Sequence, residues 1–296
     1  MHNRIIEFAQ SPAYLHTRGG LFVVESEEKG EMTVPIEELG CIIIAHPQCR
    51  ITQSALAKLA SGNVPVISCN EKYMPVGVMM PLHAHTTHTE RLAAQSSASQ
   101  PLKKQLWKQV VQCKVLAQAR ALEEWTGNDN GLHHLANDVR SGDPENIEAQ
   151  AANRYWPTIF GDPDFRRNPD LDDQNKLLNY GYAILRAIIT RAICGVGLHP
   201  ALGIFHHNKY NPYCLADDLM EPYRPLIDKQ VASIIVKEGD TIDLLPHIKQ
   251  RLIATASGRY DFHGEQRTMF DIAVQTSRSL ATAIMGGEKK LIFAEL

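Results

Sequence analysis

The amino-acid sequence predicts an α+β protein with a small N-terminal β domain that contains one short helix, a linker, and a larger all-α C-terminal domain. Three observations lead to this prediction. Short β-prone runs separated by turn residues fill residues 1–82, and residues 83–100 are rich in Ser, Thr, Ala and His. Residues 101–296 have apolar side chains at helical spacing. We therefore expect the domain boundaries at 82/83 and 100/101.

The β-prone runs begin with a hairpin signal. In YLHTRGGLFVVES, Gly19 and Gly20 separate two β-prone runs, which is typical of a tight turn. Further strand candidates follow as EMTVPI, CIIIA, VPVIS and MPVGVM. The helix predicted among them covers residues 52–62, because Thr52 can cap its start and Gly62 can end it.

Helical spacing of apolar residues dominates the chain beyond the predicted linker. The helix candidates are LKKQLWKQVVQCKVLAQARALEEW, PENIEAQAANRYWPTIFG, NKLLNYGYAILRAIITRAICGVG, LIDKQVASIIVK and TMFDIAVQTSRSLATAIMG. We expect no strand in this part.

The composition describes a globular chain. Of 296 residues, 44% are hydrophobic and 21% are charged, which excludes a disordered protein. The six cysteines form no CxxC pair, so we expect reduced thiols in a cytoplasmic protein. The start, MHNRIIEFAQ, is no signal peptide and the apolar runs are too short to span a bilayer, so no membrane partner is expected.

The net charge of −3 provides no overall basic surface for nucleic acid. DNA binding would therefore depend on local patches, whose alternative role is solubility. The candidates are Lys103, Lys104, Lys108, Lys114, Arg120, Arg166, Arg167, Lys289 and Lys290.

The stretch HHNKYNPYCLADDLMEPYRP, residues 206–225, combines imidazoles and carboxylates. Asp218 and Glu221 can share a helix face because they are three residues apart. Pro222 disfavours helical geometry at Glu221, so we expect a helix to end or kink there and another to start near Pro225. His206 precedes a turn-rich segment that can fold its ring back toward Glu221.

A second acid stands in ENIEAQAANRYW, where Glu148 shares one side of a helix with Ala151, Ala152 and Tyr155. One His and two Glu would suit Mg²⁺ or Mn²⁺, and the imidazole favours Mn²⁺. Spacing alone favours solvated acids and an ordinary loop histidine, because nothing local joins Glu148 to Glu221. His83, His85 and His88 in HAHTTHTE are a minor alternative metal site.

These two segments resemble the paired signatures of the CRISPR adaptation integrase family, the metal-dependent endonuclease subunit that inserts new spacers into CRISPR arrays. Family members have an E-x-x-A-A-x-x-Y-W helix, and a G-h-h-H turn that precedes L-A-x-D-L-x-E-P-F-R-P. The resemblance covers the whole chain, and the residues of the two motifs are most similar to those of the form in type II systems. The matching residues are Glu148, Ala151, Ala152, Tyr155, Trp156, His206, Leu215, Ala216, Asp218, Leu219, Glu221, Pro222, Arg224 and Pro225, with Tyr223 replacing Phe.

The resemblance implies that Glu148, His206 and Glu221 are catalytic and bind Mg²⁺ or Mn²⁺, with Asp218 as a support or extra ligand. The role of His207 stays open, although the spacing to Glu221 favours His206 as the ligand. The implied activity of the C-terminal domain is metal-dependent DNA endonuclease and integrase activity. It would insert foreign DNA fragments into a CRISPR array by transesterification at the repeat ends.

The resemblance also implies the partners. They are double-stranded DNA, as prespacer fragment and CRISPR repeat, a second copy in a homodimer, and a small ferredoxin-like adaptation partner in a heterohexamer. Two alternatives remain. A non-catalytic DNA-organising subunit would not need Glu148, His206 and Glu221 intact. A metal-dependent nucleotide phosphohydrolase would use His206, His207 and Asp217 or Asp218, but its class needs a His-Asp dipeptide, which this sequence lacks.

Overall fold

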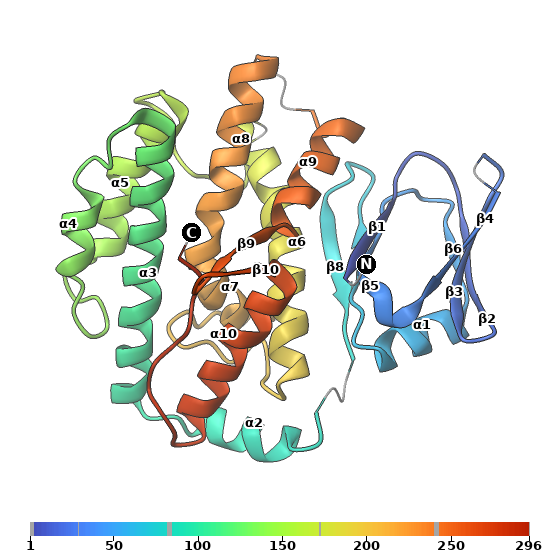
Figure 1. Ribbon diagram of the computed structural model, residues 1–296, viewed down its shortest axis with the longest axis horizontal. Coiled ribbons are helices and arrows are strands. Elements are labelled where there is room, and N and C mark those ends of the chain that lie inside the picture. Colours follow the sequence, from blue (N-terminus) through green and yellow to red (C-terminus); the bar gives the residue numbers. More distant parts are fainter. Residues whose placement is uncertain (1–2, 29, 82–84, 172, 240–242, 296) are drawn as a thin grey trace.

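The computed structural model describes residues 3–28, 30–81, 85–171, 173–239 and 243–295. Most of its strands lie in the N-terminal part, and a larger helical part lies beside them (Figure 1). The α+β class, with N-terminal β-sheets and a larger helical C-terminal region, is therefore confirmed.

The N-terminal part contains two four-stranded sheets. One sheet has the order β1 (Arg4–Phe8), β5 (Leu39–Ile44), β7 (Val66–Cys69), β8 (Pro75–Met79), and its strands are parallel except for the β7–β8 pair. The other sheet has the order β4 (Gly30–Pro35), β3 (Leu21–Ser26), β2 (Tyr14–Arg18), β6 (Arg50–Ile51). The short 3₁₀ helix η1 (Ile36–Glu38) leads into β5.

The predicted hairpin and helix of this part are both present. Gly19 and Gly20 have φ of 57° and 86°, which lets the chain turn sharply between β2 and β3. Thr52 Oγ1 accepts the Ala55 N–H at 3.2 Å and so caps the start of α1 (Gln53–Ser61). The side chains of α1 and of both sheets meet in one buried core.

The helical part is built around α6 (Gln174–Gly195), which contacts α7, α8, α9 and α10 and also β5 and β8. Three buried sheet residues, Cys41, Ile43 and Ile67, belong to the same core as these helices. The other helices are α2 (His88–Ser96), α3 (Gln100–Thr126), α4 (Leu132–Asn137), α5 (Ile147–Phe160), α7 (Cys214–Met220), η2 (Glu221–Tyr223), α8 (Arg224–Glu238), α9 (Pro246–Ala256) and α10 (Met269–Ile284).

The expectation of an all-α C-terminal part was wrong. β9 (Arg259–Phe262) and β10 (Glu265–Thr268) form an antiparallel hairpin there. Its turn residues His263 and Gly264 have φ of 55° and 85°, the geometry that tight hairpins require. Strands of four residues carry too little alternation to stand out against the surrounding helical pattern.

Helix α2 lies inside segment 83–100, whose composition predicted a linker. Its Gln95 side chain is buried and donates to the carbonyls of His199 and Leu202 at 3.0 and 2.8 Å. These tertiary contacts stabilise a helix that local composition does not reveal. The predicted boundary at 82/83 falls on residues outside those described, and both boundaries remain predictions.

Two further expectations concern the state of the cysteines and the presence of membrane spans. All six cysteines lie in the described residues, and none of them forms a disulfide. Across the described residues, no helix has the length and apolar character needed to cross a membrane.

Candidate metal centre

Glu148 stands in the first turn of α5. The Asp143 carboxylate accepts the N–H groups of Ile147 and Glu148 at 2.8 and 3.0 Å, so it fixes the start of this helix. Ala151, one turn further on, is fully buried against the core. The helix start thus aims the Glu148 carboxylate toward the neighbouring helix α3.

Glu221 lies at the break between α7 and α8, as its position before Pro222 predicted. α7 ends at Met220, and Pro225 stands in the first turn of α8. The short η2 segment between them holds Glu221, which is only 6% exposed. Arg224 Nε lies 2.9 Å from Glu221 Oε1, so the charge of this carboxylate is partly balanced from its own chain segment.

The two acids meet at Lys114 of α3. Lys114 Nζ lies 2.6 Å from Glu148 Oε1 and 2.6 Å from Glu221 Oε2. Burial alone would lower the pKa of Lys114, but the two carboxylates raise it. Burial alone would raise the pKa of Glu221, whereas Arg224 and Lys114 lower it to about 2. Two acids far apart in sequence therefore share one point of positive charge.

Asp218 holds His206. The fully buried Asp218 accepts the N–H groups of Ile204 and Phe205 on Oδ2, at 2.6 and 2.9 Å. Its Oδ1 accepts the His206 N–H at 3.3 Å and lies 2.6 Å from His206 Nδ1. Since this carboxylate acts as the acceptor, the neutral form of His206 carries its proton on Nδ1 and has its lone pair on Nε2.

The loop around Asp218 depends on Gly203. A Cβ atom at this position would lie 2.3 Å from the His206 carbonyl oxygen and 3.0 Å from Asp218 Oδ2. Only glycine therefore lets the chain close tightly enough to aim three successive N–H groups at one carboxylate. This close approach is the physical reason for the glycine of the G-h-h-H signature in this chain.

His206 lies within electrostatic reach of both glutamates. Its hydrogen bond to Asp218 raises the pKa of His206, and the charges of Glu221 and Glu148 raise it further. Its ring meets Trp107 edge-on, with 5.4 Å between the ring centroids. Glu148, Glu221 and His206 are thus brought to one region of the helical part, although their roles remain a prediction.

His207 lies in a cavity beside the site. Its ring is exposed and lines a cavity of about 380 Å³ together with Lys103, Lys104 and Trp107. His207 Nδ1 lies 2.5 Å from the Phe205 carbonyl oxygen. This placement favours His206 over His207 as the partner of the glutamates.

The donor set fits a small divalent cation. Two carboxylates and an imidazole whose Nδ1 is already engaged are ligands that Mg²⁺ and Mn²⁺ accept. Within the part of the chain that the structure describes, no three His, Cys, Asp or Glu side chains are arranged as a ready cation site. Instead, the Lys114 ammonium group lies between the two carboxylates, and it marks where positive charge is favoured.

Sequence reasoning missed Lys114. We treated it as one of several basic residues along α3 that either follow DNA or face solvent, but its side chain is only 14% exposed. The available signal was its position in VVQCKVLA, where Val110, Val111 and Val115 are fully buried. A lone lysine inside an apolar run indicates a buried charge with a partner.

A buried network behind the site was also missed. Tyr155 OH donates to Asp228 Oδ2 at 3.1 Å, and Tyr182 OH donates to Asp228 Oδ1. These bonds connect α5, α6 and α8, so they hold α5, which carries Glu148, next to α8, which directly follows the η2 segment of Glu221. The minor histidine site gained no support, since His83 lies outside the described residues and His85 lies beside Arg91 in a different cavity.

The fold and these contacts define a class: an α+β protein with a two-sheet N-terminal part and a helical part that gathers two acids and an Asp-supported histidine. The chain belongs to the family described as CRISPR associated protein Cas1, whose family model matches residues 8–262. The resemblance to the CRISPR adaptation integrases is therefore confirmed. The type II assignment remains a prediction.

The chain is similar to named relatives. It is 42% identical over 233 residues to the CRISPR-associated endonuclease Cas1 of Neisseria meningitidis serogroup C, which covers 77% of this chain and 76% of that protein. Its fold is similar to that of a casposase bound to integration product, with a TM-score of 0.77, 20% identity, and coverage of 99% and 93%. It also matches a Cas6-RT-Cas1-Cas2 complex, with a TM-score of 0.78, 18% identity, and coverage of 100% and 36%.

Proposed function

We propose that this protein is a metal-dependent DNA endonuclease and integrase that inserts DNA fragments into a CRISPR array by transesterification at the repeat ends. Membership of the Cas1 family supports this proposal, as does the relative that is named an endonuclease. The observation that carries it is that Glu148 and Glu221 both contact the Lys114 ammonium group, which lies 2.6 Å from each carboxylate.

In this proposal Glu148, His206 and Glu221 hold Mg²⁺ or Mn²⁺. When bound, such an ion polarises a phosphoryl oxygen and lowers the pKa of a bound hydroxyl group. Glu148 and Glu221 supply the negative charge that favours the ion, and His206 Nε2 supplies a neutral donor. Asp218 positions the imidazole and keeps the proton on Nδ1.

The surface beside His206 suits a DNA strand. Lys103 and Lys104 line the cavity of about 380 Å³ next to the site and can meet phosphates. Phe205 is 46% exposed and stacks on Trp107, with 4.4 Å between the ring centroids. An exposed ring beside basic side chains is the combination with which proteins hold single strands.

The proposed assembly follows from the family. It comprises a homodimer, double-stranded DNA, and a small ferredoxin-like adaptation partner that joins two dimers into a heterohexamer in the cytoplasm. A neighbour titled a Cas6-RT-Cas1-Cas2 complex supports a partner of this kind.

The test incubates the protein with labelled branched duplexes in Mn²⁺, Mg²⁺ or EDTA and follows strand cleavage and joining. We expect metal-dependent products from the wild type and from His207→Ala, and none from Glu148→Gln, His206→Ala or Glu221→Gln. Calorimetric titration with Mn²⁺ should show weaker binding for the same three variants. Normal products from His206→Ala would remove this residue from the site.

The same experiment separates the two alternatives. A non-catalytic DNA-organising subunit would bind the branched duplex and leave it unchanged in every metal, with the adaptation partner present as well. A nucleotide phosphohydrolase would release phosphate from mononucleotides and leave the duplex intact.

A further inference from the structure

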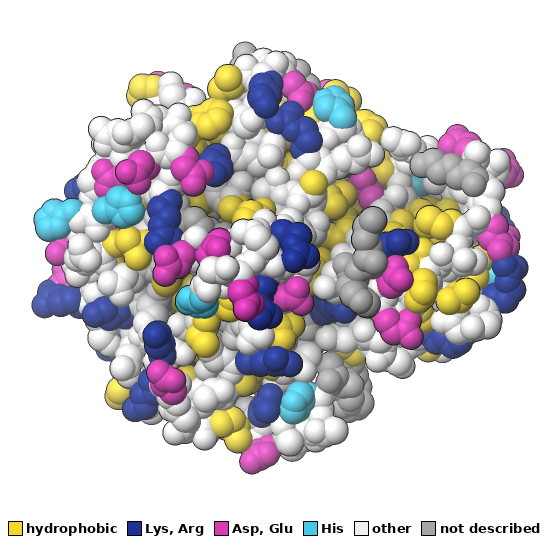
Figure 2. All heavy atoms as spheres, viewed as in Figure 1, with side chains coloured by type: hydrophobic (Ala, Val, Ile, Leu, Met, Phe, Trp, Pro, Cys, Tyr) yellow, Lys and Arg dark blue, Asp and Glu magenta, His cyan; other side chains and the backbone are white. Residues whose placement is uncertain are grey.

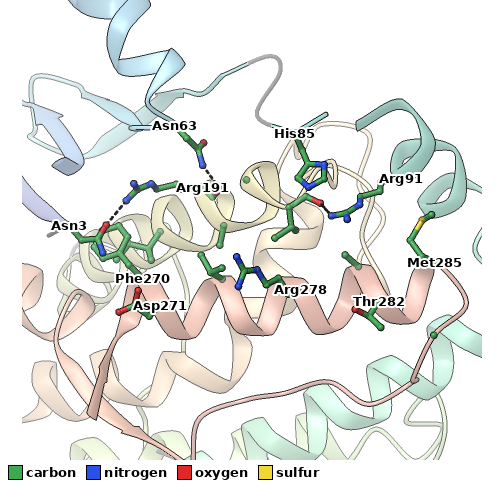
Figure 3. Close-up of a pocket in the computed structure, with 17 residues that line it drawn as sticks. Asn3, Asn63, His85, Arg91, Arg191, Phe270, Asp271, Arg278, Thr282 and Met285 are labelled. Atoms are coloured by element: carbon green, nitrogen blue, oxygen red, sulfur yellow. Dashed lines mark hydrogen bonds between the residues drawn. The ribbon is translucent and has the colours of Figure 1, made fainter. Parts of the chain in front are cut away.

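A second polar cavity, of about 870 Å³, lies where the N-terminal part meets the helical part (Figure 3). Asn3 and Asn63 reach it from the N-terminal part, Arg91 from α2, Arg191 from α6 and Arg278 from α10. None of the residues assigned to the metal centre lines this cavity. It is therefore a separate site.

The lining carries excess positive charge. Among the described residues, the lining holds three guanidinium groups and one carboxylate, that of Asp271. Asp271 is already engaged, because its carboxylate accepts the Thr268 hydroxyl at 2.6 Å at the start of α10. Among the described residues, Arg91, Arg191 and Arg278 have no carboxylate within ion-pair distance, whereas many other basic residues of this chain have one.

The neutral contacts of these arginines leave most of their N–H groups unused. Arg191 Nη1 donates to Asn3 Oδ1 at 2.9 Å and to the Gly40 carbonyl at 3.4 Å, and its guanidinium lies 5.3 Å from the centre of the Phe270 ring. Arg91 Nη1 donates to the Val196 carbonyl. Each guanidinium has five N–H groups, so these contacts satisfy only a small part of the donors.

Arg278 is the exposed member of the set. Its side chain projects from α10 toward the space between Arg191 and Arg91 in Figure 3, and it has no polar partner among the described residues. Dark blue side chains lie on the face shown in Figure 2 over the region of α10 and α2, and Arg278 and Arg91 are the basic residues of these two helices. The positive charge of the cavity is therefore accessible from the surface at Arg278.

Burial lowers the pKa of Arg191, and Asp271 is the one carboxylate among the described lining residues that can balance the three guanidinium groups. A ligand with several anionic oxygens would balance the remaining positive charge and accept hydrogen bonds from the unused N–H groups. Arginine is the side chain best suited to phosphate, since its planar N–H pairs match two oxygens at once. The cavity exceeds a single phosphate in volume and lies in the size range of small-ligand sites.

We propose that this cavity is a phosphate-binding site, with Arg278 and Arg91 as the principal donors and Arg191 as the support between the two parts of the chain. The ligand carries its phosphate either as a phosphodiester of a DNA strand or as a free nucleotide or inorganic phosphate. The DNA source rests on the proposed function, whereas the free-phosphate source does not.

Arg278→Glu is the informative variant, because Arg278 makes no hydrogen bond or ion pair with the part of the chain that the structure describes. Arg191 is unsuitable, since it bonds to Asn3 and accepts from Asn63 Nδ2 through its carbonyl at 3.2 Å. Arg50→Glu is the matched control. Arg50 is also exposed, lies on β6 and does not line the cavity, so it changes the net charge equally.

The first arm measures the anisotropy of a labelled DNA duplex in EDTA across a series of salt concentrations. If DNA is the ligand, Arg278→Glu should weaken binding about tenfold at 0.1 M salt and reduce the salt slope by about 0.9 for each lost phosphate contact. Arg50→Glu should bind like the wild type. No metal is present, so failure of the catalytic proposal would not affect this readout.

The second arm measures the melting temperature with added ATP or inorganic phosphate. If the ligand is a free phosphate compound, the wild type and Arg50→Glu should be stabilised and Arg278→Glu should not be. A loss confined to the first arm identifies DNA, and a loss confined to the second identifies a free phosphate compound. The proposal is overturned if Arg278→Glu matches the wild type in both arms, or if Arg50→Glu shows equal losses.

Discussion

At the residue scale, Lys114 balances the charge of the two glutamates when no metal ion is bound. It separates two carboxylates that would otherwise face each other in a poorly hydrated place, and it lies 2.6 Å from both. A divalent ion bound by the same carboxylates would supply this charge instead. The lysine therefore holds the geometry of the site in the metal-free protein.

Lys114→Met should therefore destabilise the metal-free protein and have less effect on the metal-bound one. Removing one member of a buried charge cluster leaves the others unbalanced, so we expect a loss of about 3 kcal/mol in the free energy of unfolding in EDTA. Saturating Mn²⁺ should recover much of this loss. Urea unfolding in both conditions tests it, with Lys108→Met on the same helix as the control. An equal loss with and without Mn²⁺ would show that Lys114 does not stand in for the ion.

Asp218→Asn should disable His206 while it keeps the shape of the site. The asparagine oxygen can still accept the N–H groups of Ile204 and Phe205, but its amide then faces His206 Nδ1. Nδ1 must accept that bond, so the proton moves to Nε2 and the ring loses its donor for a metal. We expect Mn²⁺ affinity, measured by calorimetry, to fall about 10- to 100-fold. Unchanged affinity would mean that the tautomer of His206 is set by another group.

At the scale of the elements, Asp228 joins three helices through Tyr155 and Tyr182. Burial raises the pKa of Asp228 to about 7, and the two tyrosine hydroxyl groups and the arginines Arg224 and Arg167 limit the rise. In the unfolded chain the pKa of an aspartate is about 3.9. Between these values the folded state binds more protons than the unfolded state.

Stability should therefore fall as pH rises through this window. The contribution of protonated Asp228 is fully present below about pH 4 and is lost as pH rises through about 7. Asp228→Asn cannot ionise, so its unfolding free energy should lack this fall. Urea unfolding of both proteins from pH 4.5 to 8 should give curves that diverge with rising pH. Parallel curves would show that Asp228 is ionised throughout.

Elements were predictable where local sequence decides them. Thr52 caps α1, Gly19 and Gly20 turn the β2–β3 hairpin, and Pro222 ends a helix at Glu221, and each of these effects acts within a few residues. Helix α2 and the β9–β10 hairpin were missed because distant contacts or very short strands define them. Gln95 of α2 depends on carbonyls more than a hundred residues away.

In the candidate site, too, the features set by local sequence could be predicted and those set by distant contacts could not. Glu148, His206 and Glu221 could be named because two sequence signatures carry them, and Asp218 could be named as a support. The contacts of Lys114 could not be predicted, since no spacing within one helix shows which acids of two other helices will meet it. The Asp228 network joins side chains of three helices and was hidden for the same reason.

At the scale of the whole molecule, the N-terminal part and the helical part pack against each other and are not connected by a linker alone. Glu7 of β1 accepts the Tyr180 hydroxyl at 2.9 Å and lies 3.2 Å from Lys249 Nζ. Tyr180 and Lys249 are buried and belong to α6 and α9. Since sheet residues also share the helical core, we expect one cooperative unfolding transition.

Glu7→Ala tests this coupling, because the change lies in the N-terminal part while all three tryptophans, Trp107, Trp125 and Trp156, lie in the helical part. The variant leaves the Lys249 charge buried without its carboxylate, which should lower the free energy of unfolding by about 3 kcal/mol. If the parts unfold together, tryptophan fluorescence and circular dichroism should shift equally to lower urea. Glu37→Gln, an exposed glutamate of η1, should shift neither signal. A fluorescence transition that stays in place while the dichroism transition shifts would show two separately unfolding parts, joined only by the chain.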